Sequence, residues 1–115
     1  MVSNLQHYPY VTITNKTPYD TLDIQNSNVV QYSTRALFCS DDLYSVAAQQ
    51  TWKASSRGEC LVHRITATLT IPDGPGYLLC TTYKSSGTGH SIYSIIMKGD
   101  DVCCVRSSHE SQKCL

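Results

Sequence analysis

The segment from Ser85 to Ser91 gathers side chains that could hydrogen-bond a polar ligand. Its sequence, Ser-Ser-Gly-Thr-Gly-His-Ser, offers small hydroxyls, backbone amides beside glycine and one imidazole. Sugars and other polyols are recognised by groups of this kind, and loops commonly present them. We therefore predict ligand-binding roles for five residues of this segment, with a mobile hairpin loop as the alternative interpretation. The five are Ser85, Ser86, Thr88, His90 and Ser91.

Trp52 is the only tryptophan of the chain and lies in the polar stretch from Gln49 to Ser55. An exposed indole can stack on the apolar C–H face of a sugar ring, so we include Trp52 in the predicted binding site. The alternative is a core tryptophan packed under a disulfide, as in many β-sandwiches.

Cysteine is abundant for a chain of 115 residues, with six copies. An even number in a short chain predicts a disulfide framework and favours a secreted or cell-surface protein. Cys103 and Cys104 are adjacent in a predicted strand, so their side chains point to opposite faces and should bond to different partners. The expected framework is Cys39 with Cys60, Cys80 with one member of that adjacent pair, and Cys114 with the other; further connectivities stay open.

The segment from Met1 to Tyr10 lacks the basic start and apolar run of a signal peptide. Either a signal was removed and Met1 was added for expression, which we favour, or the protein is intracellular with free thiols. No apolar run approaches the roughly 18 residues of a membrane span. The triplet Asn15-Lys16-Thr17 is a glycosylation sequon, which predicts an exposed, glycosylated strand end at Asn15.

Catalytic and cofactor motifs are missing. The Ser85 to Ser91 segment lacks the Lys-Ser/Thr ending of a phosphate loop and the G-x-S-x-G frame of a nucleophile elbow. The histidines, His7, His63, His90 and His109, have no diagnostic catalytic partner. We therefore expect neither catalysis nor a cofactor.

Metal and nucleic-acid binding are also disfavoured. Cys60 and His63 have a C-x-x-H spacing, but positions three apart on a strand face opposite ways. The pairs Asp41-Asp42 and Asp100-Asp101 lack a calcium-loop signature, so we expect no metal site. Nine basic and nine acidic residues give a net charge of +0. The basic residues form no stripe, which argues against nucleic acid as a partner.

Strand patterns dominate the chain. From Cys60 to Ile71, most apolar residues lie at odd-numbered positions, which predicts a strand with one buried face. They are Leu61, Ile65, Ala67, Leu69 and Ile71. The proline- and glycine-rich turn after it predicts a hairpin with a second strand from Tyr77 to Tyr83. The segments from Ile92 to Met97 and from Val102 to Arg106 predict another hairpin.

The first half gives weaker strand signals at Tyr10 to Thr14, Val29 to Thr34 and Leu43 to Ala47. A short helical turn is the most that Ser45 to Ala54 suggests. The fold we predict for residues 1–115 is a single all-β domain, a disulfide-stabilised, two-sheet antiparallel β-sandwich of about six to eight strands. A small β-barrel is the alternative.

Three parts of the sequence resemble small β-sandwich haemagglutinins of lower eukaryotes such as slime moulds. They are Val11 to Tyr19 (Val-Thr-Ile-Thr-Asn-Lys-Thr-Pro-Tyr), Cys39 to Asp42, and Trp52 followed by Arg57 to Val62 (Arg-Gly-Glu-Cys-Leu-Val). The resemblance implies a lectin that binds carbohydrate without a cofactor. It assigns no sugar-binding residue of this chain.

The function that we predict is therefore a secreted or cell-surface lectin, non-catalytic, with a glycan or glycoprotein as partner and a possible homodimer for avidity. Neutral charge and abundant Tyr, Ser and Thr suit such a surface. Three alternatives stay open: a membrane-active or toxin-like domain with interfacial tyrosines, a disulfide-rich inhibitor or protein-binding module, and a cytosolic or virus-encoded protein with free thiols.

Overall fold

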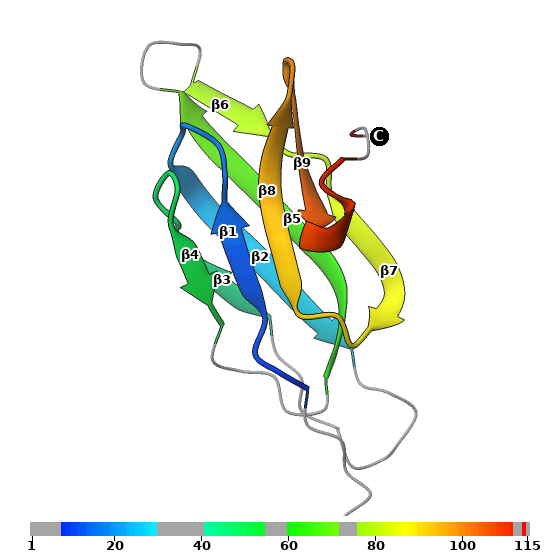
Figure 1. The fold of residues 1–115 in the computed structure, drawn as a ribbon. Coiled ribbons are helices and arrows are strands. Elements are labelled where there is room, and N and C mark those ends of the chain that lie inside the picture. Colours follow the sequence, from blue (N-terminus) through cyan, green and yellow to red (C-terminus); the bar gives the residue numbers. More distant parts are fainter. Residues whose placement is uncertain (1–7, 30–40, 55–59, 72–75, 112–113, 115) are drawn as a thin grey trace, which may run out of the picture.

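The computed structural model describes residues 8–29, 41–54, 60–71, 76–111 and 114. Within these ranges the chain forms nine strands and one short 3-10 helix, η1 (Figure 1). The strands are β1 (Thr12–Asn15), β2 (Thr21–Val29), β3 (Asp42–Tyr44), β4 (Thr51–Lys53), β5 (Leu61–Ile71), β6 (Gly76–Leu79), β7 (Tyr83–Thr88), β8 (Ile92–Lys98) and β9 (Asp101–Arg106), and η1 spans Ser107–His109. No helix in these ranges is long and apolar enough to cross a membrane.

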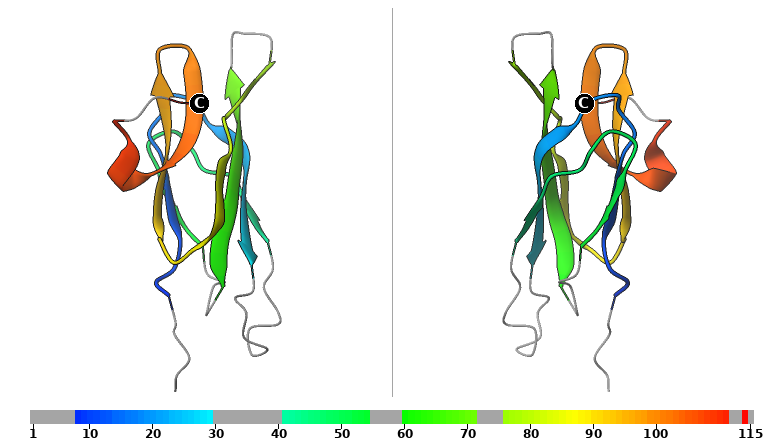
Figure 2. Two further views of the ribbon diagram at one scale, coloured as in Figure 1. Left: turned by 90° about the vertical axis from the view of Figure 1, so that its right-hand side faces the viewer. Right: turned by 90° about the vertical axis from the view of Figure 1, so that its left-hand side faces the viewer.

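The strands form two sheets that face each other as two layers (Figure 2). The front sheet has the order β4-β1-β8-β9, and the back sheet has the order β3-β2-β5-β6, with β7 also paired to β5. The predicted two-sheet sandwich is confirmed. One pairing differs from the all-antiparallel expectation, because β1 and β8 run parallel.

Strand β5 is the longest strand described and pairs with three others, β2, β6 and β7. Its inner face is Val62, Ile65, Ala67 and Leu69, each at most 4% exposed. The predicted parity is wrong at the start of the strand, where Val62 is buried and Leu61 only half-buried. The register shifts near Val62 against both β2 and β7, and such an irregularity inverts the alternation of side chains.

Both predicted hairpins form. Strands β8 and β9 pair up to Lys98 and Asp101, with Gly99 at φ +61° in the turn, and β5 pairs with β6 as far as Ile71 and Gly76. The predicted strand from Tyr77 to Tyr83 is interrupted, since β6 ends at Leu79 and β7 begins at Tyr83.

The remaining strand predictions are met in part. Strands β1 and β3 overlap the segments predicted at Tyr10 to Thr14 and at Leu43 to Ala47. Strand β2 ends at Val29, where the third predicted segment begins, and the rest of that segment lies outside the described residues. Trp52 lies on β4 instead of in a helical turn. A backbone turn with Gln49 at φ 67° leads into that strand.

The core lies between the two sheets. Its largest fully buried side chains come from both layers: Tyr93, Ile13, Ile65, Leu69, Ile95, Val11 and Val62. Each aliphatic side chain of this size contributes roughly 1.5 to 3 kcal/mol by leaving water. The ring of Tyr93 meets the ring of Tyr83 edge to face, with centroids 4.9 Å apart. This aromatic pair joins the front sheet to the back sheet.

Asn15 is fully buried, which corrects the expectation of an exposed glycosylation site. Its amide nitrogen donates to the carbonyl oxygens of Tyr19 (2.7 Å) and Val46 (3.1 Å). Its amide oxygen accepts from the backbone N–H and the hydroxyl of Thr17, at 3.1 and 2.7 Å. Both ends of the amide are therefore used in closing the loop after β1, and no room is left for a glycan in the folded state.

The disulfide prediction is confirmed for Cys103 with Cys114, whose Cα atoms are 5.6 Å apart. Cys60 is also disulfide-bonded, and its predicted partner Cys39 lies outside the described residues. The predicted bond from Cys80 to a member of the adjacent pair is not formed in the structure, where Cys80 and Cys104 are buried and carry free thiols.

Candidate functional site

A groove of about 570 Å³ lies at the end of the front sheet where β8 begins and β9 ends. We call it the Tyr10 groove. Its lining comes from the segment before β1, from the start of β8 with the residues that precede it, and from the junction of β9 with η1. These parts of the chain are distant in sequence, and the parallel β1–β8 pair together with the β8–β9 hairpin makes them neighbours.

Two exposed apolar side chains line the groove. Tyr10 is 49% exposed and Ile92 is 63% exposed. The Lys53 ammonium lies 5.4 Å from the centre of the Tyr10 ring, a distance typical of a cation–π contact. Since one face of the tyrosine packs near this cation while much of the ring meets solvent, Tyr10 is held in place and still able to stack on a ligand.

The polar residues that line the groove include Ser91, which hydrogen bonds tie to its neighbours. The Ser91 hydroxyl lies 3.2 Å from the carbonyl oxygens of both Pro9 and Gly89, and the Ser91 carbonyl accepts from the Thr12 N–H at 2.8 Å. These contacts tie the segment before β1 to the segment before β8. The groove is therefore held by hydrogen bonds as well as by the sheet.

The loop that leads into β8 is fixed in two further ways. The Thr88 hydroxyl accepts from the His90 N–H at 3.1 Å, and the Tyr93 hydroxyl donates to the His90 carbonyl at 3.1 Å. At Gly89, a Cβ atom would lie only 2.6 Å from a ring carbon of Tyr8. Glycine is thus required at this position by the close approach of the Tyr8 ring.

The predicted binding residues separate into two groups. His90 and Ser91 line the Tyr10 groove, and Thr88 supports it through its hydroxyl. Ser85 and Ser86 lie on β7 in the back sheet and do not line the groove. The Ser85 hydroxyl donates to the Val62 carbonyl at 2.9 Å and accepts from the Gly87 N–H at 3.1 Å, which are backbone-supporting contacts.

Trp52 lies away from the groove and packs against the core from β4. It pairs with Ile13 across the sheet and therefore faces inward with that buried residue. Its ring stacks on Tyr44 with centroids 5.4 Å apart and planes 19° apart. The two rings join the β4 edge of the front sheet to the β3 edge of the back sheet, so Trp52 is a partly buried structural residue.

Sequence reasoning missed Tyr10, Ile92, Arg106 and Ser107, all of which line the groove. The excess of tyrosine was a general signal for a recognition surface, but it singled out no position. Only the sheet order brings Arg106 beside the start of β8, because it pairs across the strands with Tyr93.

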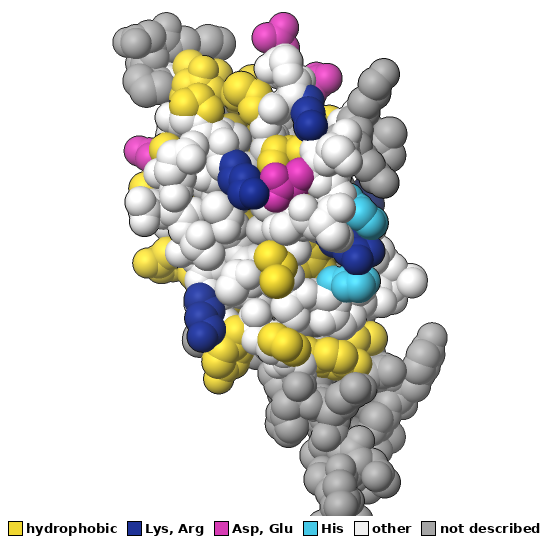
Figure 3. Space-filling model, in the orientation of Figure 1, with side chains coloured by type: hydrophobic (Ala, Val, Ile, Leu, Met, Phe, Trp, Pro, Cys, Tyr) yellow, Lys and Arg dark blue, Asp and Glu magenta, His cyan; other side chains and the backbone are white. Residues whose placement is uncertain are grey.

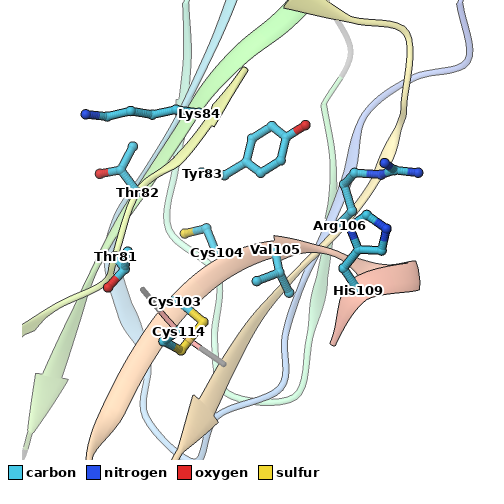
Figure 4. Close-up of a pocket in the computed structure, with 10 residues that line it drawn as sticks. All are labelled: Thr81, Thr82, Tyr83, Lys84, Cys103, Cys104, Val105, Arg106, His109 and Cys114. Atoms are coloured by element: carbon cyan, nitrogen blue, oxygen red, sulfur yellow. A yellow bond between two sulfur atoms is a disulfide. The ribbon is translucent and has the colours of Figure 1, made fainter. Parts of the chain in front are cut away.

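A second hollow of about 280 Å³ lies where the two sheets part, between Thr81–Lys84 and Cys103–Arg106 (Figure 4). We call it the inter-sheet pocket. The Cys103–Cys114 disulfide lies at one end, and Arg106 and His109 lie together at the other, while Lys84 points away from them (Figure 4). Arg106 lines both this pocket and the Tyr10 groove.

Beside the groove, Glu110 fastens the η1 region to the front sheet. Its carboxylate accepts from the Lys16 ammonium at 2.7 and 3.0 Å and from the buried Ser94 hydroxyl at 2.7 Å. Ser94 also shares a hydrogen bond of 2.7 Å with Ser107, which lines the groove. The hydrogen bonds from Lys16 and Ser94 lower the pKa of Glu110.

Acidic and basic side chains are distributed unequally over the face drawn in Figure 3. In the upper half of the described surface, Asp or Glu side chains are visible. In the lower half, the coloured ionisable side chains are Lys or Arg and His. No Asp or Glu is among the described residues that line the groove. Elsewhere, burial and the neighbouring Asp41 raise the pKa of Asp42.

The described residues contain no group of three or more His, Cys, Asp or Glu side chains placed to hold a metal ion. In chemical terms, the Tyr10 groove offers an aromatic face, an aliphatic side chain, hydroxyls and a guanidinium. Comparisons with protein-family models, with curated proteins and with solved structures found no match to this chain. The resemblance to small haemagglutinins therefore stays a prediction.

Proposed function

We propose that this chain is a non-catalytic carbohydrate-binding protein and that it holds a glycan in the Tyr10 groove. The observation that supports this most directly is that one groove is lined by the exposed Tyr10 and by the hydroxyl residues Ser91 and Ser107. A sugar ring has an apolar C–H face and a rim of hydroxyls, so it needs an aromatic surface and hydrogen-bonding groups side by side.

The supports of the groove favour recognition without large rearrangement. Ser91 is held by its contacts to Pro9 and Thr12, and Gly89 packs closely on Tyr8. These contacts are present without a ligand. A site that is already formed loses less conformational entropy on binding. The disulfides favour a secreted or cell-surface protein, where glycans are abundant, and we include that location in the proposal.

A glycan array probed with the purified, oxidised full chain tests this function. We expect saturable binding that free sugar competes, and we expect Tyr10→Ala to weaken it about 10-fold, since an aromatic contact contributes roughly 0.5 to 1.5 kcal/mol beyond the apolar area that the ring buries. Tyr77→Ala is the matched control, because Tyr77 is a more exposed tyrosine (64%) on β6 of the back sheet. Absence of binding to any glycan, or equal loss in both variants, would contradict the proposal.

A further inference from the structure

Arg106 gives the groove a positive charge, and no acidic side chain is among the described residues that line the groove. Among the residues that the structure describes, Arg106 has no acidic partner, and the recorded ion pair joins Lys16 to Glu110 instead. The groove lining includes no carboxylate. A second cation, Lys53, lies beside the groove against Tyr10.

This arrangement differs from a groove built for neutral sugars. An unpaired guanidinium has several N–H donors in a planar fork, which matches the two oxygens of a carboxylate. Arg106 is partly buried at the end of β9, so its interaction with an anion would be less screened by salt than that of a fully exposed arginine. The charged side chains in the lower half of Figure 3 are basic or His, which extends the same bias beyond Arg106.

We infer that the glycan bound in the Tyr10 groove is an acidic one, with a carboxylate-bearing sugar such as a sialic or uronic acid placed toward Arg106. This inference rests on the proposed function and narrows its ligand class. The Tyr10 ring would contact the apolar face of the sugar, and the hydroxyls of Ser91 and Ser107 would bind its polar rim. Charge complementarity would then select acidic glycans over their neutral parents.

The test compares each acidic glycan with its neutral counterpart, using sialylated and desialylated N-acetyllactosamine and glucuronyl and glucosyl oligosaccharides as probes. We expect the acidic member to bind at least ~10-fold more tightly, and we expect this preference to decline between about 50 and 300 mM NaCl. Arg106→Gln should remove the preference. Lys98→Gln, which removes one charge from the distant β8–β9 hairpin, should keep it.

The outcomes separate the two proposals. Equal binding of acidic and neutral members, or an acidic preference that survives Arg106→Gln, would overturn the inference and leave carbohydrate binding intact. Binding of neither class would overturn carbohydrate binding itself, and the inference with it.

A separate observation concerns the two free thiols. Thr81 forms an isolated parallel bridge with Cys103: its N–H donates to the Val102 carbonyl at 2.8 Å, and its carbonyl accepts from the Cys104 N–H at 3.0 Å. Thr81 follows β6 of the back sheet, so this bridge joins the two sheets at one edge. Cys80 precedes Thr81, and Cys104 follows Cys103. Because side chains alternate between the two faces of a strand, Cys80 and Cys104 both lie on the face opposite to the two bridge residues, which is the inner face.

Both cysteines are buried there, at 8% and 4% exposure, within the same hydrophobic core cluster. The Cys104 thiol hydrogen-bonds with Cys80, and its sulfur accepts from the Tyr83 N–H. The hydrogen bond with Cys80 and burial raise the pKa of Cys104 well above its ordinary value, so Cys104 is held as a neutral thiol at pH 7.

We propose, independently of the ligand, that Cys80 and Cys104 form a third disulfide, which connects the two sheets, when the protein is oxidised. With glutathione disulfide as oxidant, the two thiols lose two protons and two electrons, one S–S bond forms, and the oxidant is reduced to two glutathione thiols. Because both thiols are buried and Cys104 is neutral, this bond should form more slowly than one between exposed cysteines.

Peptide mapping without reduction tests this bond, after incubation of the folded full chain in glutathione disulfide and alkylation in denaturant. We expect a peptide pair that links Cys80 to Cys104. Cys80→Ser should leave one alkylated cysteine, Cys104, and should lower the melting temperature of the oxidised protein by about 10 °C. Alkylation of both Cys80 and Cys104 in the oxidised wild type, or linkage of either to another cysteine, would overturn the proposal.

Discussion

The Thr17 hydroxyl donates to the amide oxygen of Asn15 at 2.7 Å, and both residues are fully buried. The two polar residues of the sequon are thus a structural unit. With the bonds from Asn15 to the Tyr19 and Val46 carbonyls, they close the loop after β1 and connect it to the chain before β4.

Asn15→Ala should therefore lower the free energy of unfolding by about 3 kcal/mol, because it leaves several buried donors and acceptors without partners. Thr14→Ala is the control, since its hydroxyl makes only an exposed bond to Thr51 and its loss should cost less than about 1 kcal/mol. Urea unfolding followed by circular dichroism measures both. Similar losses for the two variants, or a glycan found on Asn15 of the folded protein, would contradict this role.

Glu110 should make stability depend on pH. The pKa of Glu110 is lowered from the ordinary value of 4.5. The stability that its ionised carboxylate contributes is therefore present above pH 4.5 and is lost as the pH falls through the lowered pKa. Glu110→Gln should destabilise the protein at pH 7 by about 1 kcal/mol or less, because the ion pair with Lys16 is partly exposed. Melting temperatures of wild type and variant should converge below pH 4.5. A constant difference down to pH 2 would show that the carboxylate charge is not the cause.

Trp52 should matter for stability and not for ligand binding. Trp52→Ala removes the stack on Tyr44 and the contact with the core, and should cost about 2 to 3 kcal/mol. Trp52→Phe keeps an aromatic ring at the same place and should recover most of that loss. Glycan affinity of Trp52→Phe should equal that of the wild type, in contrast to Tyr10→Ala. A loss of affinity in Trp52→Phe would show that Trp52 belongs to the binding site.

Local features of the fold were predictable from the sequence. Turn residues such as Gly99 stand next to the strands that they connect, so the β8–β9 hairpin follows from neighbouring residues alone. The bulge near Val62 was not predictable, because an irregularity in pairing depends on the partner strand and leaves the hydrophobic pattern of β5 ambiguous. The break at Cys80 likewise depends on the bridge from Thr81 to Cys103 in the other sheet.

The candidate site was predictable only in part. His90 and Ser91 stood out because hydroxyls and glycines cluster in the sequence around them. Tyr10 and Arg106 come from opposite ends of the chain, and the parallel pairing of β1 with β8 is what brings them to one groove. Ser85 and Asn15 were given ligand or glycan roles because a polar side chain looks the same in sequence whether it faces a ligand or supports the backbone.

The central claim, that the Tyr10 groove is where the ligand binds, is tested most directly by mapping amide chemical shifts of the ¹⁵N-labelled full chain during titration with its best glycan. The account predicts that the amides of Tyr10, Gly89, Ser91, Ile92 and Ser107 shift together and saturate at one affinity, while those of β6 and the β8–β9 turn stay in place. Shifts confined to the β7 amides of Ser85 and Ser86, or to the surroundings of Trp52, would contradict it.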